Sequence, residues 1–497
     1  MSGPGDAFPL GGPGTPRLPG RPVPLSPRFL ERLSGACAQV DTDPSSLAEA
    51  GRDWWPIGLR WAAAGQVPAL AGALARPAGP EEVAGVLALC HREGVPVIPV
   101  GARSGVCGGA VPVFGGVCLD LGALSGLGQV DDASLLVEAG AGTLGQDLED
   151  ALRRDHRLTL GHWPQSMAIS SVGGWLACRS AGQYSTRYGK IEDMVVGLEV
   201  ALADGRLVRT GGQGPRQAVG PDLNQVFVGS EGTLGVITRA WLRARPVPSA
   251  TGRRAFGFAS FEQGLEACRL VLRSGATPAV LRLYDRAESA RHFGDADACV
   301  LVVLDEAEPP LLEATLSLVE RACRPAAPRD PSLVDAWLAR RNDVSALGEA
   351  LSRGLVVDTV EVAARWSALP ALYRSVLDAL RALEGTVAAS AHQSHAYPDG
   401  ACLYFTFAGL GPDPADLDWA DAYYRSAWQA VMAATLAAGA AISHHHGVGL
   451  NRGPWVEASL GPSAQVLRAL KAALDPKGIL NPAKLGLGSP FGPPPWP

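Results

Sequence analysis

The spacing of hydrophobic residues alternates between helical and extended patterns once the N-terminal segment is passed. Over 80–91, apolar positions recur three and four residues apart behind a proline, which predicts an amphipathic helix. The apolar run 95–100 then predicts a short buried strand. Further apolar runs surround Asp204-Gly205, a turn pair typical of a hairpin, and 226–228 continues the extended pattern. We therefore interpret residues 67–248 as one α+β domain.

The second half of the chain follows a strand–helix–strand pattern with long helices. Helices are expected over 261–274 and 366–383, and strands over 299–304 and 403–407. An antiparallel sheet with helices on one face fits this order of elements. The expected fold class is therefore α+β throughout.

The N-terminal residues differ from the rest of the chain. Residues 1–26 are rich in proline and glycine, which predicts a disordered tail. Residues 27–66 are expected to form an N-terminal helical segment, and its Trp54, Trp55 and Trp61 are most simply explained as core packing.

Composition narrows the class of protein. The chain has 497 residues, 47% hydrophobic and 19% charged, which predicts at least two globular domains. A net charge of −6 without a long basic run argues against a nucleic-acid partner. Nine scattered cysteines without a CxxC pair argue against a disulfide framework and favour a reducing compartment. Since neither a signal-peptide core nor an apolar stretch long enough to span a membrane is found, we expect a cytoplasmic protein.

Three glycine-rich segments carry candidate binding chemistry. In 99–109, which follows a strand directly, consecutive backbone N–H groups can converge on a phosphate. In 161–193, small residues and hydroxyls can pack against a flat ligand and donate hydrogen bonds. The glycines of 229–238 suit a turn that enters an edge strand beside a ligand. Read singly, each segment is also compatible with an ordinary tight loop.

A run of three histidines carries the candidate proton chemistry. Three adjacent side chains cannot share one face of a helix or strand, so Ser443–Gly449 suits an irregular turn. Imidazoles titrate nearest neutrality and can therefore exchange protons with a substrate. A surface histidine run remains the alternative for this segment taken alone.

The three glycine-rich segments, in this order and spacing, resemble the FAD-binding domain of the vanillyl-alcohol oxidase superfamily. This resemblance implies a two-part PCMH-type FAD-binding domain over 67–248, a cap or substrate domain over 249–442, and a histidine-run loop with a C-terminal return over 443–497. It implies FAD contacts from three segments and one asparagine: Pro99, Val100, Gly101, Ala102, Arg103, Ser104, Gly105; Pro164, Gln165, Ser166, Met167, Ala168, Ile169, Ser170, Ala177, Cys178, Arg179, Ser180; Glu231, Gly232, Thr233, Leu234, Gly235, Val236, Ile237; and Asn481.

Within that superfamily the chain resembles alkyldihydroxyacetonephosphate synthase and related bacterial FAD-linked oxidases. The similar segments are 188–193, 229–238, 402–405 and 443–449. The resemblance implies that Tyr404 donates and accepts a proton and that His444, His445 and His446 lie beside the flavin. It also implies a required role for Arg282, for which a salt bridge at a domain interface is the alternative.

Two comparisons within the superfamily concern cofactor attachment and metal. The first loop offers no histidine for a covalent flavin bond, although Cys107 follows it, so we expect non-covalent FAD. The 2-hydroxyacid dehydrogenase relatives bind a divalent metal partly through a histidine at the position of Tyr404. A phenol is a poor metal ligand, so no metal site is expected.

One departure concerns the substrate. The synthase binds its anionic substrate with an arginine where a gapless alignment places Leu347. Leucine cannot hold a phosphate or carboxylate, unless a shifted alignment lets Arg340, Arg341 or Arg353 compensate.

The sequence thus predicts an FAD-dependent oxidoreductase acting on a small organic substrate by hydride transfer to flavin N5, with tyrosine- and histidine-assisted proton transfer. The alternative is an alkyldihydroxyacetonephosphate synthase-like transferase of ether-lipid synthesis, working through a flavin adduct without net redox change. A flavin-carrying protein without turnover is a third class, which Tyr404 and the histidine run argue against. The expected partner is a small-molecule substrate, and a homodimer remains open.

Overall fold

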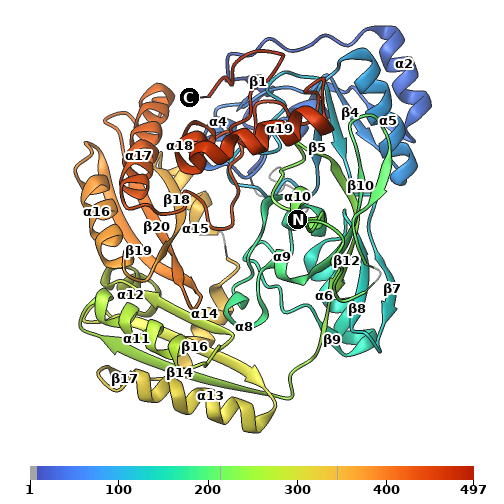
Figure 1. The fold of residues 1–497 in the computed structure, drawn as a ribbon. Coiled ribbons are helices and arrows are strands. Elements are labelled where there is room, and N and C mark those ends of the chain that lie inside the picture. The colour runs from blue at the N-terminus through green and yellow to red at the C-terminus, as the bar shows by residue number, and fades with distance from the viewer. Residues whose placement is uncertain (1–7, 213, 344, 497) are drawn as a thin grey trace.

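The computed structural model describes residues 8–212, 214–343 and 345–496, except for the side chains of 345–346. Three of the five sheets in this part of the chain have four or more strands and organise the fold, and the C-terminal segment crosses back from the third of them to the first (Figure 1). No helix within it is both long and apolar enough to cross a membrane.

The first sheet is built around the predicted strand and helix at 80–100. Its strands stand in the order β2 (Gln39–Asp41), β4 (Ala73–Arg76), β6 (Val117–Asp120) and β5 (Val97–Val100). The helices α2 (Pro27–Ala36) and α5 (Pro80–Glu93) pack together beside it. Helix α5 ends at Gly94 with φ 67°, a left-handed conformation that favours glycine. A bridge from Val97 to Leu480 attaches the C-terminal segment to this sheet.

The second sheet is antiparallel and contains the predicted hairpin. Its order is β11 (Leu207–Arg209), β10 (Val195–Ala201), β12 (Val236–Arg243), β8 (Leu136–Gly140) and β7 (Leu127–Asp131). The expectation of an extended segment at 226–228 is wrong, because these residues lie mostly in the short helix α10 (Asn224–Phe227). Three apolar residues are too few to distinguish the helical period from the strand period. The burial of Phe227 is compatible with a helix and with a strand.

The third sheet confirms the predicted antiparallel arrangement. Its order is β17 (Ala327–Arg329), β14 (Ala250–Phe258), β16 (Cys299–Ala307), β15 (Val280–Tyr284), β19 (Thr386–Ala396), β20 (Gly400–Gly409) and β18 (Val356–Arg365). Four helices cover one face: α11 (Phe261–Arg273), α13 (Pro309–Ala322), α16 (Leu369–Arg381) and α17 (Leu417–Ala437). The shorter α12 (Arg286–Phe293) and α14 (Ser332–Arg340) pack on the other side.

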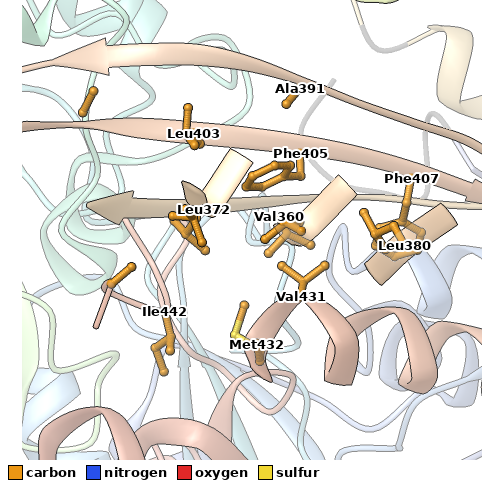
Figure 2. Close-up of a cluster of buried hydrophobic side chains, with 14 of the residues drawn as sticks. Val360, Leu372, Leu380, Ala391, Leu403, Phe405, Phe407, Val431, Met432 and Ile442 are labelled. Atoms are coloured by element: carbon orange, nitrogen blue, oxygen red, sulfur yellow. The ribbon is translucent and has the colours of Figure 1, made fainter. Parts of the chain in front are cut away.

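Alternation along β20 determines which side chains face the site. Leu403, Phe405 and Phe407 are buried in the apolar cluster beneath α16 and α17 (Figure 2). Successive residues of a strand point to opposite faces, so Cys402 and Tyr404 point away from that cluster. Strands β18, β19 and β20 therefore present one apolar face to the helices and one polar face to the FAD-binding half, whereas β15 and β16 bury Val280 and Val302 on that second side.

The expected disordered tail is wrong for residues 8–26. Strand β1 (Thr15–Pro16) pairs with β3 (Gln66–Val67), and the ring of Phe8 lies edge-on to Trp54 at 5.3 Å. Arg17 also pairs with Asp421 of α17 at 2.9 Å. Phe8 and Arg17 find their partners only on the surface of the folded protein. The composition of the segment therefore could not show that it is ordered. The remaining tail, 1–7, lies outside the described residues.

The N-terminal helical segment also contains helices α3 (Pro44–Ala50) and α4 (Pro56–Ala63). Its Trp55 and Trp61 are fully buried and pack edge-on to each other with ring centroids 5.5 Å apart. Trp61 donates to Asp421 of α17 at 2.7 Å, so this segment attaches the FAD-binding half to the cap.

Candidate functional site

A cavity of about 860 Å³ lies between the FAD-binding half and the polar face of the third sheet. All three glycine-rich segments line it, as do Asn481, Arg282, Tyr404, His445 and His446. A few of the predicted contact residues are not among the lining residues: Met167, Arg179, Thr233, Leu234 and His444. Met167 and Leu234 belong instead to a hydrophobic core, and Arg179 pairs with Glu192.

The first segment forms a cradle that only glycine permits at its start. A Cβ at Gly101 would stand 2.3 Å from the hydroxyl of Ser171, so the backbone there is pressed against the second segment. Among the described residues, the Nε and Nη1 atoms of Arg103 have no hydrogen-bond partner, and Nη1 lies 3.9 Å from a carboxylate oxygen of Asp120. A largely buried guanidinium with two unsatisfied donors beside a glycine cradle fits an anionic group such as the pyrophosphate of FAD.

The third segment is tied to the histidine run and to the C-terminal return. The buried carboxylate of Glu231 accepts the backbone N–H of Gly449 at 2.7 Å. Asn481 donates its side-chain amide to the carbonyl oxygens of Glu231 at 2.7 Å and of Gly109 at 3.0 Å. Burial raises the pKa of Glu231 although the amides of Val448 and Gly449 oppose the shift. These contacts join stretches that are far apart in the sequence around one cavity.

Tyr404 lies on the cap side of the cavity beside His446. Thr359 on the neighbouring strand β18 donates its hydroxyl to the Tyr404 oxygen at 3.0 Å, and His446 Nε2 lies 3.4 Å from that oxygen. Burial raises the pKa of Tyr404 above its usual range, so the side chain is a neutral phenol. Burial lowers the pKa of His446 even though Glu361 opposes this, so the imidazole is neutral and able to accept a proton.

Glu361 of β18 holds the histidine run in place. One of its oxygens accepts the Ser443 hydroxyl at 2.9 Å and the three backbone N–H groups of His444–His446 at 2.7–3.2 Å. Both carboxylate oxygens pair with Arg452, and both side chains are fully buried. Burial would raise the pKa of Glu361, but Arg452 holds it well below its usual range. Glu361 was not among the predicted site residues, although a charged residue between Val360 and Val362 in a buried strand was a usable signal.

A second cluster that sequence reasoning missed surrounds Arg282. His392 of β19 stacks on Tyr404 with ring centroids 4.8 Å apart, and its Nε2 contacts the Arg282 guanidinium. Its Nδ1 lies 2.7 Å from buried Glu288, which also pairs with Arg291 at 3.0 Å. Burial lowers the pKa of His392 to about 4, with Arg282 adding to the effect. Glu288 has its pKa lowered to about 2, because His392 and Arg291 outweigh its burial.

The cap side of the cavity carries positive charge. Arg282, Arg291, Arg340 and Arg341 all line it. Leu347 lines it as well but packs in an apolar cluster with Trp54, Leu59 and Leu351. Arg353 is not among the lining residues and pairs with Glu349 at 2.5 Å. Leu347 replaces the substrate-binding arginine of the synthase, and three arginines were candidates to compensate for it. Of these, Arg340 and Arg341 line the cavity.

Two models of known protein families match the chain. Residues 71–211 match the model of an FAD binding domain, and 247–485 match that of the C-terminal domain of FAD linked oxidases. An FAD-linked oxidoreductase of Escherichia coli K12, YgcU, is 32% identical over 417 residues, covering 81% of this chain and 86% of the relative.

Solved structures share the fold. A structure of alkyldihydroxyacetonephosphate synthase superposes with a TM-score of 0.77 at 25% identity, covering 94% of this chain and 88% of the other. A structure of p-cresol methylhydroxylase with substrate bound has a TM-score of 0.77 at 18% identity, covering 94% and 99%. The second likeness establishes the fold alone.

Proposed function

Because the chain belongs to the family of FAD-linked oxidoreductases, we propose that it oxidises a small organic substrate in the cavity between its FAD-binding half and its third sheet. FAD, when bound, supplies the acceptor for a hydride from a substrate carbon next to oxygen or nitrogen. The residues of the chain bind and orient the substrate and move the companion proton. The observation that carries the proposal is the Tyr404 hydroxyl in the cavity wall, within reach of Thr359 and His446.

The contacts around Tyr404 support a path for that proton. Because Thr359 donates to the phenolic oxygen, the Tyr404 hydrogen is free to be given to His446 Nε2 or to the substrate. His446 Nδ1 lies 3.6 Å from the buried carboxylate of Glu361. That carboxylate balances the charge when the imidazole takes a proton, as in other histidine–carboxylate pairs. In this proposal His446 accepts the proton and Tyr404 relays it.

The arginines support a substrate that carries a negative charge. Arg282, Arg340 and Arg341 face the cavity from the cap, and a guanidinium can hold a carboxylate or phosphate with two parallel hydrogen bonds. Arg282 Nε is buried and has no hydrogen-bond partner within residues 8–212, 214–343 and 345–496, so a donor is left for a ligand. The cap would thus orient the substrate by its anionic end.

Transferase chemistry is the second candidate, favoured by the likeness to a solved alkyldihydroxyacetonephosphate synthase and by this same positive lining. In that case the cavity would hold an acyl-dihydroxyacetone phosphate and exchange its acyl group for a fatty alcohol, with no net redox change. Leu347 stands where the sequence comparison placed the substrate-binding arginine of the synthase, and it packs against the Trp54 cluster. We therefore rank oxidation first.

Anaerobic mixing tests the proposal. The purified protein with FAD is mixed without oxygen with a panel of small hydroxy acids, alcohols and amines, and the flavin absorption band is followed. A substrate that is oxidised abolishes the band persistently, whereas a transferase substrate does not. We expect Tyr404→Phe to slow this reduction by about 10²–10⁴-fold, the usual contribution of general acid–base catalysis.

The matched control is Tyr423→Phe. Tyr423 is buried in α17, its hydroxyl lies 2.9 Å from that of Thr386, and it does not line the cavity. It should reduce at the wild-type rate. An unchanged reduction rate in Tyr404→Phe would remove the proton relay from the mechanism, and a protein that takes up no FAD would remove the proposed function itself.

A further inference from the structure

Four side chains with metal-binding atoms converge next to the cavity. His395 and Cys402 are cross-strand partners on β19 and β20, and His444 and His445 come from the histidine run. One ligand atom from each lies within 4.8 Å of all the others. His395 and Cys402 are buried, and the two residues of the run are partly buried. Three imidazoles and a thiol at this spacing are the donor set of a tetrahedral transition-metal site.

Two of the imidazoles hydrogen-bond a neighbouring hydroxyl group through one ring nitrogen, which leaves the other ring nitrogen for a metal. The Tyr397 hydroxyl lies 3.0 Å from His444 Nε2, and the Ser394 hydroxyl lies 2.8 Å from His395 Nδ1. A ring nitrogen that donates to such a partner leaves the other nitrogen with its lone pair exposed, as in known metal-binding histidines. These contacts therefore free His444 Nδ1 and His395 Nε2 for an ion.

The freed nitrogens lack adequate partners within the protein. His395 Nε2 is buried and finds no hydrogen-bond partner in the described part of the chain, in a residue that is 4% exposed. His444 Nδ1 lies only 2.8 Å from His445 Nδ1, where at most one of the two atoms carries a hydrogen. A buried unpaired nitrogen is costly, and a cation between these lone pairs would satisfy them together.

We propose that His395, Cys402, His444 and His445 bind one zinc-class divalent ion through three imidazole nitrogens and one thiolate. The soft thiolate and the absence of a carboxylate from the set favour zinc over magnesium or calcium. On binding, the S–H bond of Cys402 breaks, a sulfur–metal bond forms, and the proton passes to solvent. Sequence comparison predicted no metal because Tyr404 replaces a histidine, but this set does not use position 404.

The site would fix the histidine run without occupying the proton path. His444 and His445 would be held by the ion, whereas His446 would remain beside Tyr404, 3.4 Å away. The ion would thus lie beside the cavity as a structural clamp between the run and the sheet.

Metal binding is tested on the full chain with FAD. After dialysis against a chelator, the protein is titrated with Zn²⁺ by calorimetry, metal content is measured by mass spectrometry, and the zinc coordination shell is measured by X-ray absorption. We expect one zinc per chain, with one sulfur at about 2.3 Å and nitrogens at about 2.0–2.1 Å. Cys402→Ser should lower zinc affinity at least roughly 100-fold, and Tyr397→Phe about 10-fold through its effect on His444.

Cys268→Ser is the matched control, because Cys268 is equally buried but lies in the helix-covered core of the cap. It should bind zinc as the wild type does. Zinc uptake by Cys402→Ser equal to that of the control would overturn the proposal, as would a wild-type coordination shell without sulfur. If Cys402→Ser does not fold, X-ray absorption of the wild-type protein decides the proposal by whether the zinc has a sulfur ligand.

Discussion

Removing the negative charge of Glu361 is expected to destabilise the histidine run and the fold. In Glu361→Gln the amide oxygen can still accept the Ser443 hydroxyl and the backbone N–H groups of His444–His446. Its NH₂ group, however, would face the Arg452 guanidinium, which is also a donor. Both side chains of this pair are 0% exposed, so the arginine charge would remain buried without a counter-charge.

The expected cost is about 3–5 kcal/mol, the usual effect of removing one partner of a buried ion pair. That is a large fraction of the roughly 5–15 kcal/mol by which proteins are stable. Urea unfolding followed by tryptophan fluorescence measures it as a shift of the transition midpoint, to which all twelve tryptophans contribute, Trp428 at 5.1 Å from Arg452 among them. FAD retention after gel filtration provides a second readout.

Glu457→Gln is the control for this experiment. Its pairing with Arg468 at 3.3 Å is exposed, with 76% and 46% of the two side chains accessible, and such pairs contribute about 0–1 kcal/mol. If Glu361→Gln unfolds at the same urea concentration as this control, the reasoning that Glu361 and Arg452 anchor the histidine run is refuted.

Two further predictions concern the FAD-binding half. Gly101→Ala places a Cβ 2.3 Å from the Ser171 hydroxyl and should weaken FAD binding by about 1–3 kcal/mol, measured by fluorescence titration of the apoprotein. Gly35→Ala, with open space around its Cβ, should bind FAD normally, and equal affinities in the two variants would contradict the cradle. Burial lowers the pKa of His162 from 6.5 to about 3, so the unfolded chain binds the proton first as the pH falls. This histidine should therefore cost about 2 kcal/mol of stability between pH 6.5 and about 5, a loss that His162→Phe should abolish in urea unfolding at both pH values. An identical pH dependence in both proteins would show that His162 does not titrate as described.

The sequence by itself determined the features that depend on local chemistry. Glycine-rich segments marked candidate ligand loops, because tight loops that approach a phosphate require residues without a Cβ, and their resemblance to a known superfamily identified the FAD-binding half. The apolar run 403–407 predicted a strand, and in the folded strand the alternation of side chains places Leu403 and Phe405 in the core and Tyr404 on the opposite face. The helices expected over 80–91, 261–274 and 366–383 and the strands expected over 95–100, 299–304 and 403–407 followed from periodic patterns, whereas the apolar run 226–228 was too short to decide.

Only the tertiary structure decided which distant residues meet. Glu361 contacts Arg452 through a loop return, and His392 stacks on Tyr404 because of the register between β19 and β20. The attachment of Phe8 to Trp54 likewise depends on a surface that exists only after folding. Side-chain period and turn chemistry act over a few residues, whereas these pairings are set by the packing of whole sheets, which no local pattern in the chain encodes.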